Sequence, residues 1–419
     1  MTKAGAGKVR ICIVTAGPIG SNPRVVKEAD SLHEAGFDVT VIAISMLDHV
    51  DLRDRSIMER VGWRVRRIDL RNPWRWRSHR AVQIAFRYAL DRLGGQRFAD
   101  LAFSAITQPL LLHALRRPAD LYIAHYPPAL PAAAAAARRH NALYAYDAED
   151  FHLGDWPDEP RYDAERRMVR AIEGRYLPGC AFVTAASPLI AEALVDAYGI
   201  TRPTILLNVF PLSQAPRAPT QSGSAVPGPS LYWFSQTIGP DRGLECAVRA
   251  VGLSATRPHL YLRGTPAAGY IAHLERLAAE AGAGERLHIL PPAAPERMEM
   301  LAADFDLGLC GEPGHTSNNC RALSNKLFSF LVAGVPPLLS STPAQLVFAE
   351  EAGLGDLVYP IDVAPALAAL IDRLLTTPST LATLRKKVWL LGQEQYNWDR
   401  EQLEMRNILF SLKGTADDK

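Results

Sequence analysis

Short apolar runs that predict buried strands alternate with helical patterns along nearly the whole chain. The first of them are the apolar run at 9–15, the helical pattern at 25–35 and the apolar run at 38–43. Regular alternation of this kind is typical of a parallel sheet covered by helices, so the sequence predicts an α/β fold. At 419 residues the chain is long for one such domain, and the pattern starts again at Leu231, so we expect two.

A stretch rich in proline, serine and glycine at 211–230 separates the two copies of this pattern. Such a stretch buries little apolar surface and is typical of a linker. We therefore predict a doubly wound, Rossmann-like domain at 1–210 and a second one at 231–395. The helical tail at 396–419 bends near Asn397 and is expected to pack back across the first domain.

Composition predicts an ordinary globular protein, with 48% hydrophobic and 21% charged residues. The five cysteines lie far apart without a CxxC pair, which favours reduced thiols. The apolar run near the N-terminus is too short for a signal peptide, and no run of about 18 apolar residues occurs. We expect a cytoplasmic protein, free or peripheral on the inner face of the membrane.

Positive charge is concentrated between Arg64 and Arg97. This region holds ten arginines against Asp69 and Asp91, so it carries +8 while the remainder of the chain carries −6. Aromatic residues are interleaved with these arginines: Trp63, Trp74, Trp76, Phe86 and Tyr88. The pattern indicates contact with an anionic membrane or a phosphorylated acceptor, and its alternative is a solvated basic face. No recognisable nucleic-acid-binding module accompanies it, so we expect no nucleic-acid partner.

The loop after the first strand has residues that suit a ligand-binding turn. Gly20 lets the backbone approach a ligand, and Asn22 is a capping residue type before the helix. Pro23 suits the first helical position, and Arg24 is expected at the end of the helix that faces the cleft. The loop is neither a GxGxxG nor a Walker motif, so alone it does not identify a phosphate site.

A dense polar cluster follows the predicted strand at 142–147. It contains Asp147, Glu149, Asp150 and His152, and it lies where open α/β sheets bind their ligands. These groups could do acid–base work or hold an acceptor hydroxyl, and the alternative is a helix N-terminus stabilised by acidic side chains. No spacing typical of metal ligands completes the cluster, so we predict neither a metal nor a cofactor.

The stretch at 320–342 predicts a short helix that is almost wholly apolar and leads into a buried strand. Lys326 and Ser329 fall on one narrow stripe of that helix, which we expect to face a cleft. Ser324 or Asn325 would cap the helix and leave free N–H groups for an anion, to which Lys326 adds a charge. The alternative is a core helix whose lysine extends to bulk water.

Four motifs, in order along nearly the whole chain, resemble those of the family 4 glycosyltransferases: 17–28 (GPIGSNPRVVKE), 146–150 (YDAED), 241–245 (DRGLE) and 325–336 (NKLFSFLVAGVP). The resemblance implies the glycosyltransferase B (GT-B) fold, in which two Rossmann-like domains face a central cleft. It also implies transfer of a sugar from a nucleotide-sugar donor with retention of configuration and usually without a metal. The donor would bind mainly to the C-terminal domain and the acceptor to the N-terminal one.

Carried over position by position, the resemblance implies roles for individual residues. Arg242 is similar in place to the basic residue that neutralises the diphosphate leaving group, a task that Lys326 would share. The expected catalytic residues are Arg242, Lys326, Glu149 and Asp150. Those expected to bind the donor are Gly20, Gln236, Thr237, Gly264, Ser324, Asn325 and Ser329. Those expected to bind the acceptor are Asn22, Arg24, Asp147 and His152.

The chain departs from the family's pattern at several of these positions. Arg321 and Ser329 stand where the family commonly has two glutamates, and Gln236 or Thr237 stands where an arginine is expected. Glu149 stands where many relatives have histidine. We predict a hexosyltransferase that acts on a glycan or lipid-linked acceptor in surface polysaccharide or glycoconjugate synthesis. The alternatives are a sugar-nucleotide 2-epimerase of the same fold and a catalytically silent, nucleotide-sugar-binding relative.

Overall fold

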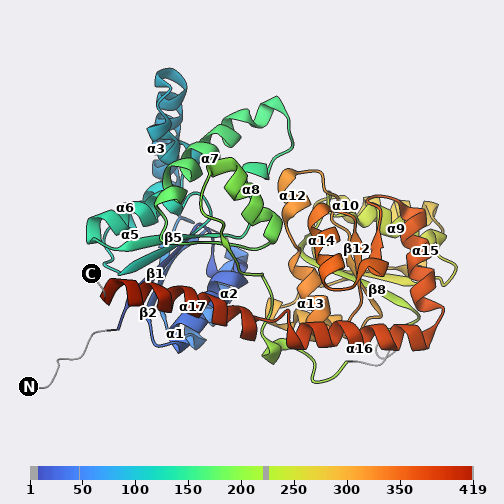
Figure 1. Ribbon diagram of the computed structural model, residues 1–419. Helices are drawn as coiled ribbons and strands as arrows, with labels where there is room; N and C mark the ends of the chain where they lie inside the picture. The colour runs from blue at the N-terminus through green and yellow to red at the C-terminus, as the bar shows by residue number, and fades with distance from the viewer. Residues whose placement is uncertain (1–7, 47, 220–225, 418–419) are drawn as a thin grey trace, which may run out of the picture. The chain divides into compact units, whose positions relative to one another are not determined.

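The computed structural model describes residues 8–46, 48–219 and 226–417, and the chain forms two compact units (Figure 1). Unit 1 comprises Met1–Leu206 and Gln402–Lys419, and unit 2 comprises Leu207–Glu401. Each unit is built on one parallel sheet, as the alternation of strands and helices predicts. Within the predicted linker, residues 220–225 lie outside the described residues, as do residues 1–7 at the N-terminus.

The sheet of unit 1 has seven parallel strands in the order β3-β2-β1-β4-β5-β6-β7. The strands are β1 (Arg10–Thr15), β2 (Asp38–Ser45), β3 (Arg64–Asp69), β4 (Leu121–His125), β5 (Leu143–Ala148), β6 (Val183–Ala185) and β7 (Thr204–Ile205). Strand order reverses direction between β1 and β4, and open sheets of this kind bind ligands outside the carboxyl ends of the strands at such a point. The loops after β1, β4 and β5 are therefore the places to look for a site.

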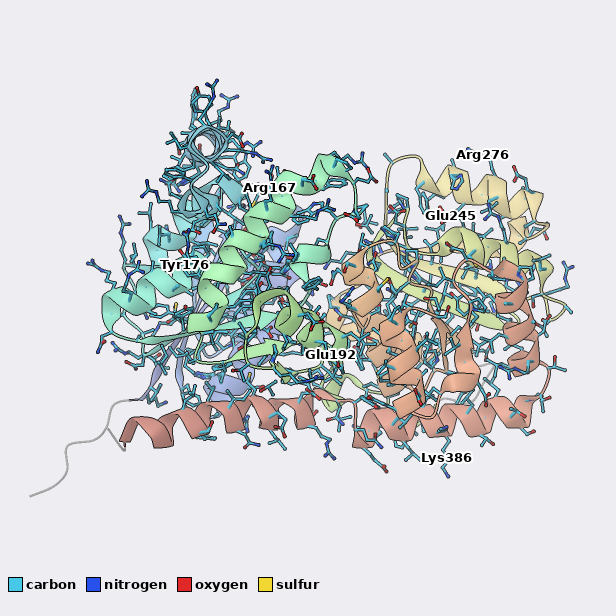
Figure 2. All side chains as sticks on the ribbon, turned by 45° about the horizontal axis from the view of Figure 1, so that its top comes forward. Arg167, Tyr176, Glu192, Glu245, Arg276 and Lys386 are labelled. Carbon is cyan, nitrogen blue, oxygen red and sulfur yellow. The ribbon has the colours of Figure 1, made fainter. Side chains whose placement is uncertain are left out.

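Helices cover this sheet. They are α1 (Pro23–Glu34), α2 (Asp48–Arg60), α3 (Pro73–Leu93), α4 (Ala99–Phe103), α5 (Thr107–Ala114), α6 (Leu130–His140), α7 (Asp163–Tyr176) and α8 (Pro188–Tyr198). Helices α4 and α5 are separate because the backbone turns extended at Ser104. Tyr176 at the end of α7, labelled in Figure 2, donates a 2.6 Å hydrogen bond to Asp100 of α4.

Helix α3 is absent from the sequence prediction. Its start is fixed by Asn72, whose side chain accepts from the N–H of Trp74 and Arg75, and its end by Gly94, which has a φ of +65°. The helix projects from the rest of its unit (Figure 1), and Gln83 is its buried residue. Most of α3 therefore contributes surface rather than core.

The sheet of unit 2 has six parallel strands in the order β10-β9-β8-β11-β12-β13. They are β8 (Ser230–Ile238), β9 (His259–Pro266), β10 (Leu287–Leu290), β11 (Leu307–Cys310), β12 (Pro337–Ser340) and β13 (Val358–Tyr359). The helices are α9 (Leu244–Leu253), α10 (Tyr270–Glu280), α11 (Met298–Ala302), α12 (Ser317–Arg321), α13 (Asn325–Ala333), α14 (Pro343–Glu351), α15 (Ala364–Leu375) and α16 (Pro378–Glu394). Order reverses between β8 and β11, so the corresponding site lies in the loops after these two strands.

The expected buried helix and strand at 320–342 are confirmed as α13 and β12. Every residue of α13 after Asn325 is buried, and so is every residue of β12. Gly334 ends the helix in the left-handed region, with a φ of +71°, as its position before Pro336 predicts.

The helical tail bends where the sequence predicts. Helix α16 ends at Glu394 and α17 (Trp398–Asp417) begins after Asn397, whose side chain accepts from the N–H of Arg400. The later part of α17 belongs to unit 1, where Arg406 donates to the Ser31 carbonyl and Phe410 contacts Phe37 with ring centroids 6.2 Å apart. None of the helices in the described ranges has the length and apolarity needed to cross a membrane.

Candidate functional site

Asn22 links the loop after β1 to the loops after β4 and β5. Its side-chain carbonyl caps α1 by accepting from the Val25 N–H at 3.1 Å. Its amide donates to the Glu149 carboxylate at 2.9 Å and to the Tyr126 hydroxyl at 3.3 Å. Tyr126 has a φ of +71°, which is rare for a residue other than glycine. Three loops of unit 1 thus meet at the carboxyl end of its sheet.

Arg24 and Asp147 form the buried base of this site. The Arg24 Nε and Nη2 atoms donate to the two Asp147 oxygens at 2.5 and 2.7 Å, and the arginine is only 1% exposed. Asp147 also accepts from the hydroxyl of Thr184. Burial alone would raise the pKa of the Asp147 carboxyl, but Arg24 outweighs that effect and lowers it. The pair is therefore ionised and buried, and the expectation that Arg24 and Asp147 bind the acceptor stays a prediction.

His125, the last residue of β4, is surrounded by carboxylates. Its Nε2 lies 2.7 Å from Glu28 Oε2, and its Nδ1 lies 3.0 Å from Glu149 Oε1 and 3.3 Å from Asp147 Oδ2. Burial alone would lower the pKa of His125, but these carboxylates raise it to about 10. The His125 imidazolium and the Asn22 amide both hydrogen-bond to Glu149 Oε1, so together they fix the position of this carboxylate.

Glu28, His125 and Asp147 place potential metal-ligand atoms within 4.8 Å of one another. The 2.7 Å separation between His125 Nε2 and Glu28 Oε2 is a hydrogen bond, which leaves no room for an ion between the two atoms. Asp147 is already bound by Arg24. The geometry of this trio fits a shared proton better than a metal, and the expectation of a metal-free enzyme stays a prediction.

His152 lies in the loop after β5, where the sequence predicts it, and packs against Tyr126 with ring centroids 5.6 Å apart. Its Nδ1 lies 2.8 Å from Asp155, which raises the pKa of the imidazole to about 9 although burial opposes this. Its Nε2 is buried and meets no partner among the described residues. Asp150, beside Glu149, is partly exposed.

Gly20 is enclosed by α2. Its N–H donates to Asp54 at 2.8 Å, and a Cβ at this position would lie 2.9 Å from the same carboxylate and 3.1 Å from Val50. The glycine is required for this close approach, and its N–H is not directed at open space. Because the Gly20 N–H is bound to Asp54, it is not available to a ligand here, and the expected contact of Gly20 with the donor stays a prediction.

The candidate site of unit 2 centres on Glu312, in the loop after β11. The Lys326 Nζ lies 3.0 Å from Glu312 Oε1, and the Ser324 hydroxyl also donates to this carboxylate. Burial alone would raise the pKa of Glu312, but Lys326, Ser324 and the charge of Arg242 lower it. The Lys326 ammonium also lies 5.6 Å from the centroid of the Trp233 ring. Two expected cations therefore act on one carboxylate, together with Ser324, which is the N-cap residue of α13 but makes no side-chain capping hydrogen bond.

Arg242 reaches this place because its loop lies against β11. The neighbouring Gly243 has a φ of +69°, and a Cβ on it would lie 2.2 Å from the Gly311 carbonyl oxygen. No described residue forms a hydrogen bond or ion pair with the Arg242 guanidinium, which is partly exposed. The close contact between Gly243 and Gly311 thus brings the unpaired Arg242 guanidinium near Glu312.

The other residues expected to bind the donor divide into two groups. Gln236, Thr237 and Asn325 are exposed, and the first two lie at an irregularity of β8 between Phe234 and Thr237. Gly264 packs on that irregularity, because a Cβ there would lie 2.4 Å from the Ser235 carbonyl oxygen.

Ser329 instead faces the interior of unit 2. Its hydroxyl donates to Glu299 of α11 at 2.7 Å, and both residues are fully buried. The expected polar stripe of α13 is therefore covered at Ser329, and only its first member, Lys326, takes part in the cluster around Glu312.

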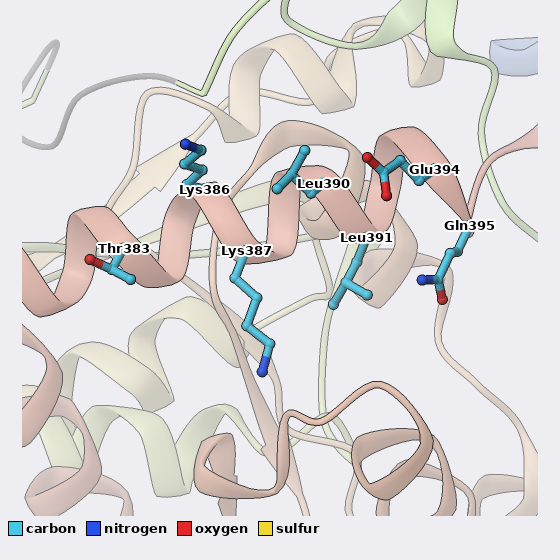
Figure 3. Close-up of a pocket in the computed structure, with 7 residues that line it drawn as sticks. All are labelled: Thr383, Lys386, Lys387, Leu390, Leu391, Glu394 and Gln395. Carbon is cyan, nitrogen blue, oxygen red and sulfur yellow. The ribbon is translucent and has the colours of Figure 1, made fainter.

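Two cavities formed by described residues lie away from these clusters. A cavity of about 340 Å³ follows α16, where Lys386 and Lys387 leave the helix in opposite directions (Figure 3). A second, of about 200 Å³, lies at the amino ends of β1 and β2, beside Arg10 and Arg117. Neither contains a residue expected to be catalytic or to bind the donor or acceptor, although Arg64 of the basic region lines the second.

Comparison with known proteins shows which fold the chain shares. The family model of the glycosyl transferase 4-like domain matches residues 20–208, and no curated protein matches at the sequence level. HepE of Anabaena, solved with UDP and glucose, is 14% identical with a TM-score of 0.70 over 96% of this chain and 100% of HepE. Sucrose-phosphate synthase of Thermosynechococcus elongatus is 14% identical with a TM-score of 0.69, over 97% and 100%.

A third solved structure is a variant of S. aureus TarM in complex with fondaparinux, α-GlcNAc-glycerol and UDP. It is 8% identical with a TM-score of 0.66, over 96% of this chain and 99% of TarM. At these identities the likeness establishes the fold, and it confirms the two Rossmann-like units expected from the sequence.

Proposed function

We propose that this glycosyltransferase of the GT-B fold, whose residues 20–208 form a glycosyl transferase 4-like domain, moves a sugar from a nucleotide-sugar donor to a glycan or lipid-linked acceptor. The observation that carries the proposal is the cluster around Glu312, where Lys326, Ser324 and Arg242 gather beside the amino end of α13. Cations and free helix N–H groups are the groups that bind a diphosphate.

In the proposed reaction the bond from the anomeric carbon to the phosphate oxygen breaks, and its electron pair leaves with the diphosphate. Arg242 and Lys326 stabilise that growing negative charge, so they contribute to rate as well as to binding. The acceptor hydroxyl oxygen forms the new bond, and Glu149 and Asp150 are the proposed acceptors of its proton. Retention of configuration and independence of metal and cofactor are part of the proposal.

The acceptor is proposed to bind to unit 1, on the surface formed by Asn22, Glu149, Asp150 and His152. HepE and TarM, solved with UDP and with glucose or a glycan, support donors and acceptors of these classes. Arg24 and Asp147 act there as positioning residues, because they are buried beneath Glu149. A role in surface polysaccharide or glycoconjugate synthesis follows from a glycan or lipid-linked acceptor.

Helix α3 is proposed to rest on an anionic membrane surface. Trp74, Ile84 and Tyr88 are 75%, 57% and 61% exposed, and their spacing places them on one face of the helix. Arg77 lies over the Trp74 ring and Arg92 over the Tyr88 ring, so cations and apolar surface alternate along that face. This combination suits a lipid headgroup layer, where aromatic rings insert and arginines meet phosphates.

The test of the proposed function is a screen of UDP-, GDP- and ADP-sugars for transfer to glycan acceptors, followed by Arg242→Ala. We expect kcat to fall by about 100-fold or more, because one fixed charge at the leaving oxygen is removed. Arg249→Ala is the matched control, since Arg249 is an exposed arginine on the adjoining α9. Unaltered turnover in Arg242→Ala would remove the proposed mechanism.

A further inference from the structure

Glu312 places a negative charge among the groups proposed to bind the donor diphosphate. Its carboxylate accepts from Lys326 Nζ and the Ser324 hydroxyl, and it lies within electrostatic range of Arg242. Ser324 is the N-cap residue of the nine-residue α13, yet its side chain makes no capping hydrogen bond. The hydroxyl is directed to Glu312 instead, so the carboxylate lies where an anion would meet the positive end of the helix.

This carboxylate is built into the unit rather than being one partner of a loose surface pair. The side chains of Glu312 and Lys326 are 19% and 11% exposed. The backbone on either side is fixed, because the Ser340 hydroxyl donates to the Glu312 carbonyl at 2.7 Å and Gly311 packs on Gly243. Charges this deeply buried interact far more strongly than exposed pairs.

We propose that Glu312 is an internal counter-ion of the donor site, which a diphosphate must displace from Lys326 and Ser324 in order to bind. The proposal rests on the proposed function, since it concerns the same site. While the site is empty, Glu312 stabilises the clustered cations and holds them in place. When the diphosphate product leaves, the carboxylate returns to the same partners, which lowers the cost of release.

A second consequence is selectivity among anions. One small anion offers too little charge to replace Glu312, whereas a diphosphate offers two linked phosphates to the same cations. Glu312 is therefore a positioning and selectivity residue of the site and not a catalytic residue.

The experiment is calorimetry with inorganic pyrophosphate, which needs no knowledge of the base, on wild type and Glu312→Gln. Glutamine keeps the size and can still accept from Ser324, but it removes the competing charge. We expect pyrophosphate to bind about tenfold more tightly to the variant, with a steeper dependence on salt. With an active sugar donor, KM and kcat should both fall, because the diphosphate product leaves more slowly. Unchanged or weaker binding of pyrophosphate would overturn the proposal.

Two further variants keep the result interpretable. Glu350→Gln removes an exposed carboxylate of the same unit, on α14, and should leave pyrophosphate binding unchanged. Should Glu312→Gln fail to fold by circular dichroism, Glu312→Asp withdraws the charge from Lys326 and carries the same expectation of tighter binding.

The outcomes also separate this proposal from the one on which it rests. If pyrophosphate binds neither wild type nor Glu312→Gln, the donor site itself is wrong. If it binds wild type, is lost in Arg242→Ala and is unaffected by Glu312→Gln, the donor site stands and the counter-ion does not.

Discussion

Arg24 binds Asp147 through two parallel hydrogen bonds of 2.5 and 2.7 Å inside unit 1. Replacing Arg24 by methionine would remove two hydrogen bonds and the nearest counter-charge of the buried Asp147 carboxylate, which would keep only the Thr184 hydroxyl and the His125 imidazolium at 3.3 Å. We expect the free energy of unfolding to fall by about 3–5 kcal/mol in urea titrations. Arg10→Met is the control, because its ion pair with Asp120 is nearly half exposed and contributes about 0–1 kcal/mol. Equal losses in the two variants would contradict the structural role of Arg24.

Because of His125, the stability of unit 1 should decrease as the pH becomes alkaline. Its pKa in the folded state, about 10, is above the ordinary value of 6.5, so the stabilisation is complete below pH 6.5 and is lost as pH rises towards 10. In this window the free energy of unfolding should fall by up to about 1.4 kcal/mol per pH unit. His152, with a pKa of about 9, adds a similar loss up to pH 9.

The measurement is urea unfolding at pH 6, 7.5 and 9 for wild type and His125→Gln. We expect the variant to be less stable at pH 6 and to lose less stability between pH 6 and 9. A parallel pH dependence in the two proteins would show that His125 is not the group responsible.

Alanine substitutions at Gly243 and Gly269 distinguish the cost of backbone strain from the cost of steric crowding. Both have left-handed φ values, +69° and +72°, but a Cβ on Gly243 would lie 2.2 Å from the Gly311 carbonyl oxygen, whereas nothing lies within 4 Å of one on Gly269. Gly269→Ala should cost about 1–2 kcal/mol of stability. Gly243→Ala should cost about 1–3 kcal/mol more, because the loop must move off β11.

The same loop carries Arg242, so Gly243→Ala should also weaken pyrophosphate binding while Gly269→Ala should not. Thermal unfolding and calorimetry on the two variants check both parts. Retention of full pyrophosphate affinity in Gly243→Ala would mean that Arg242 does not depend on the packing of Gly243.

Helix α3 gives a prediction about lipid. Wild type should co-sediment with vesicles that contain phosphatidylglycerol and not with pure phosphatidylcholine, and salt should weaken the binding. The double variant Arg77→Gln/Arg92→Gln removes two charges worth about 1 kcal/mol each at such a surface, so its partitioning should fall roughly 30-fold. Trp74→Ser should weaken it as well.

Leu253→Ser supplies the control for the apolar contribution, because Leu253 is 60% exposed but belongs to α9 of unit 2. It should leave vesicle binding unchanged. If wild type fails to bind anionic vesicles even at low salt, α3 has another role.

The sheets and the α13–β12 core were predictable because burial forces their sequences to be apolar. Helix ends were also predictable, because they depend on local residue chemistry: Asn22 caps α1, Gly334 ends α13 and Asn397 lies at the start of α17. Helix α3 was not found, because its buried position is the polar Gln83 and it has no apolar stripe directed at a core. Asn72, Pro73 and Gly94 were the signals that could have revealed it.

In unit 2 the cations of the site were predicted and its carboxylate, Glu312, was missed. Arg242 and Lys326 follow from motifs, whereas Glu312 matters only because the fold brings the loop after β11 to the start of α13. His125 and Glu28 were missed for the same reason, since the two lie 97 positions apart. Spacing along the chain carries no sign of such a contact, and a carboxylate in a loop usually indicates solvent exposure.

The chain passes between the units twice, after Leu206 and after Glu401, so unit 1 is assembled from two separate pieces of sequence. On the ribosome, unit 2 can finish folding as one uninterrupted segment. Unit 1, although begun first, keeps the α1 surface around Ser31 and Phe37 uncovered until the residues of α17 emerge. The nascent polypeptide therefore completes its domains in the reverse of the order in which it starts them.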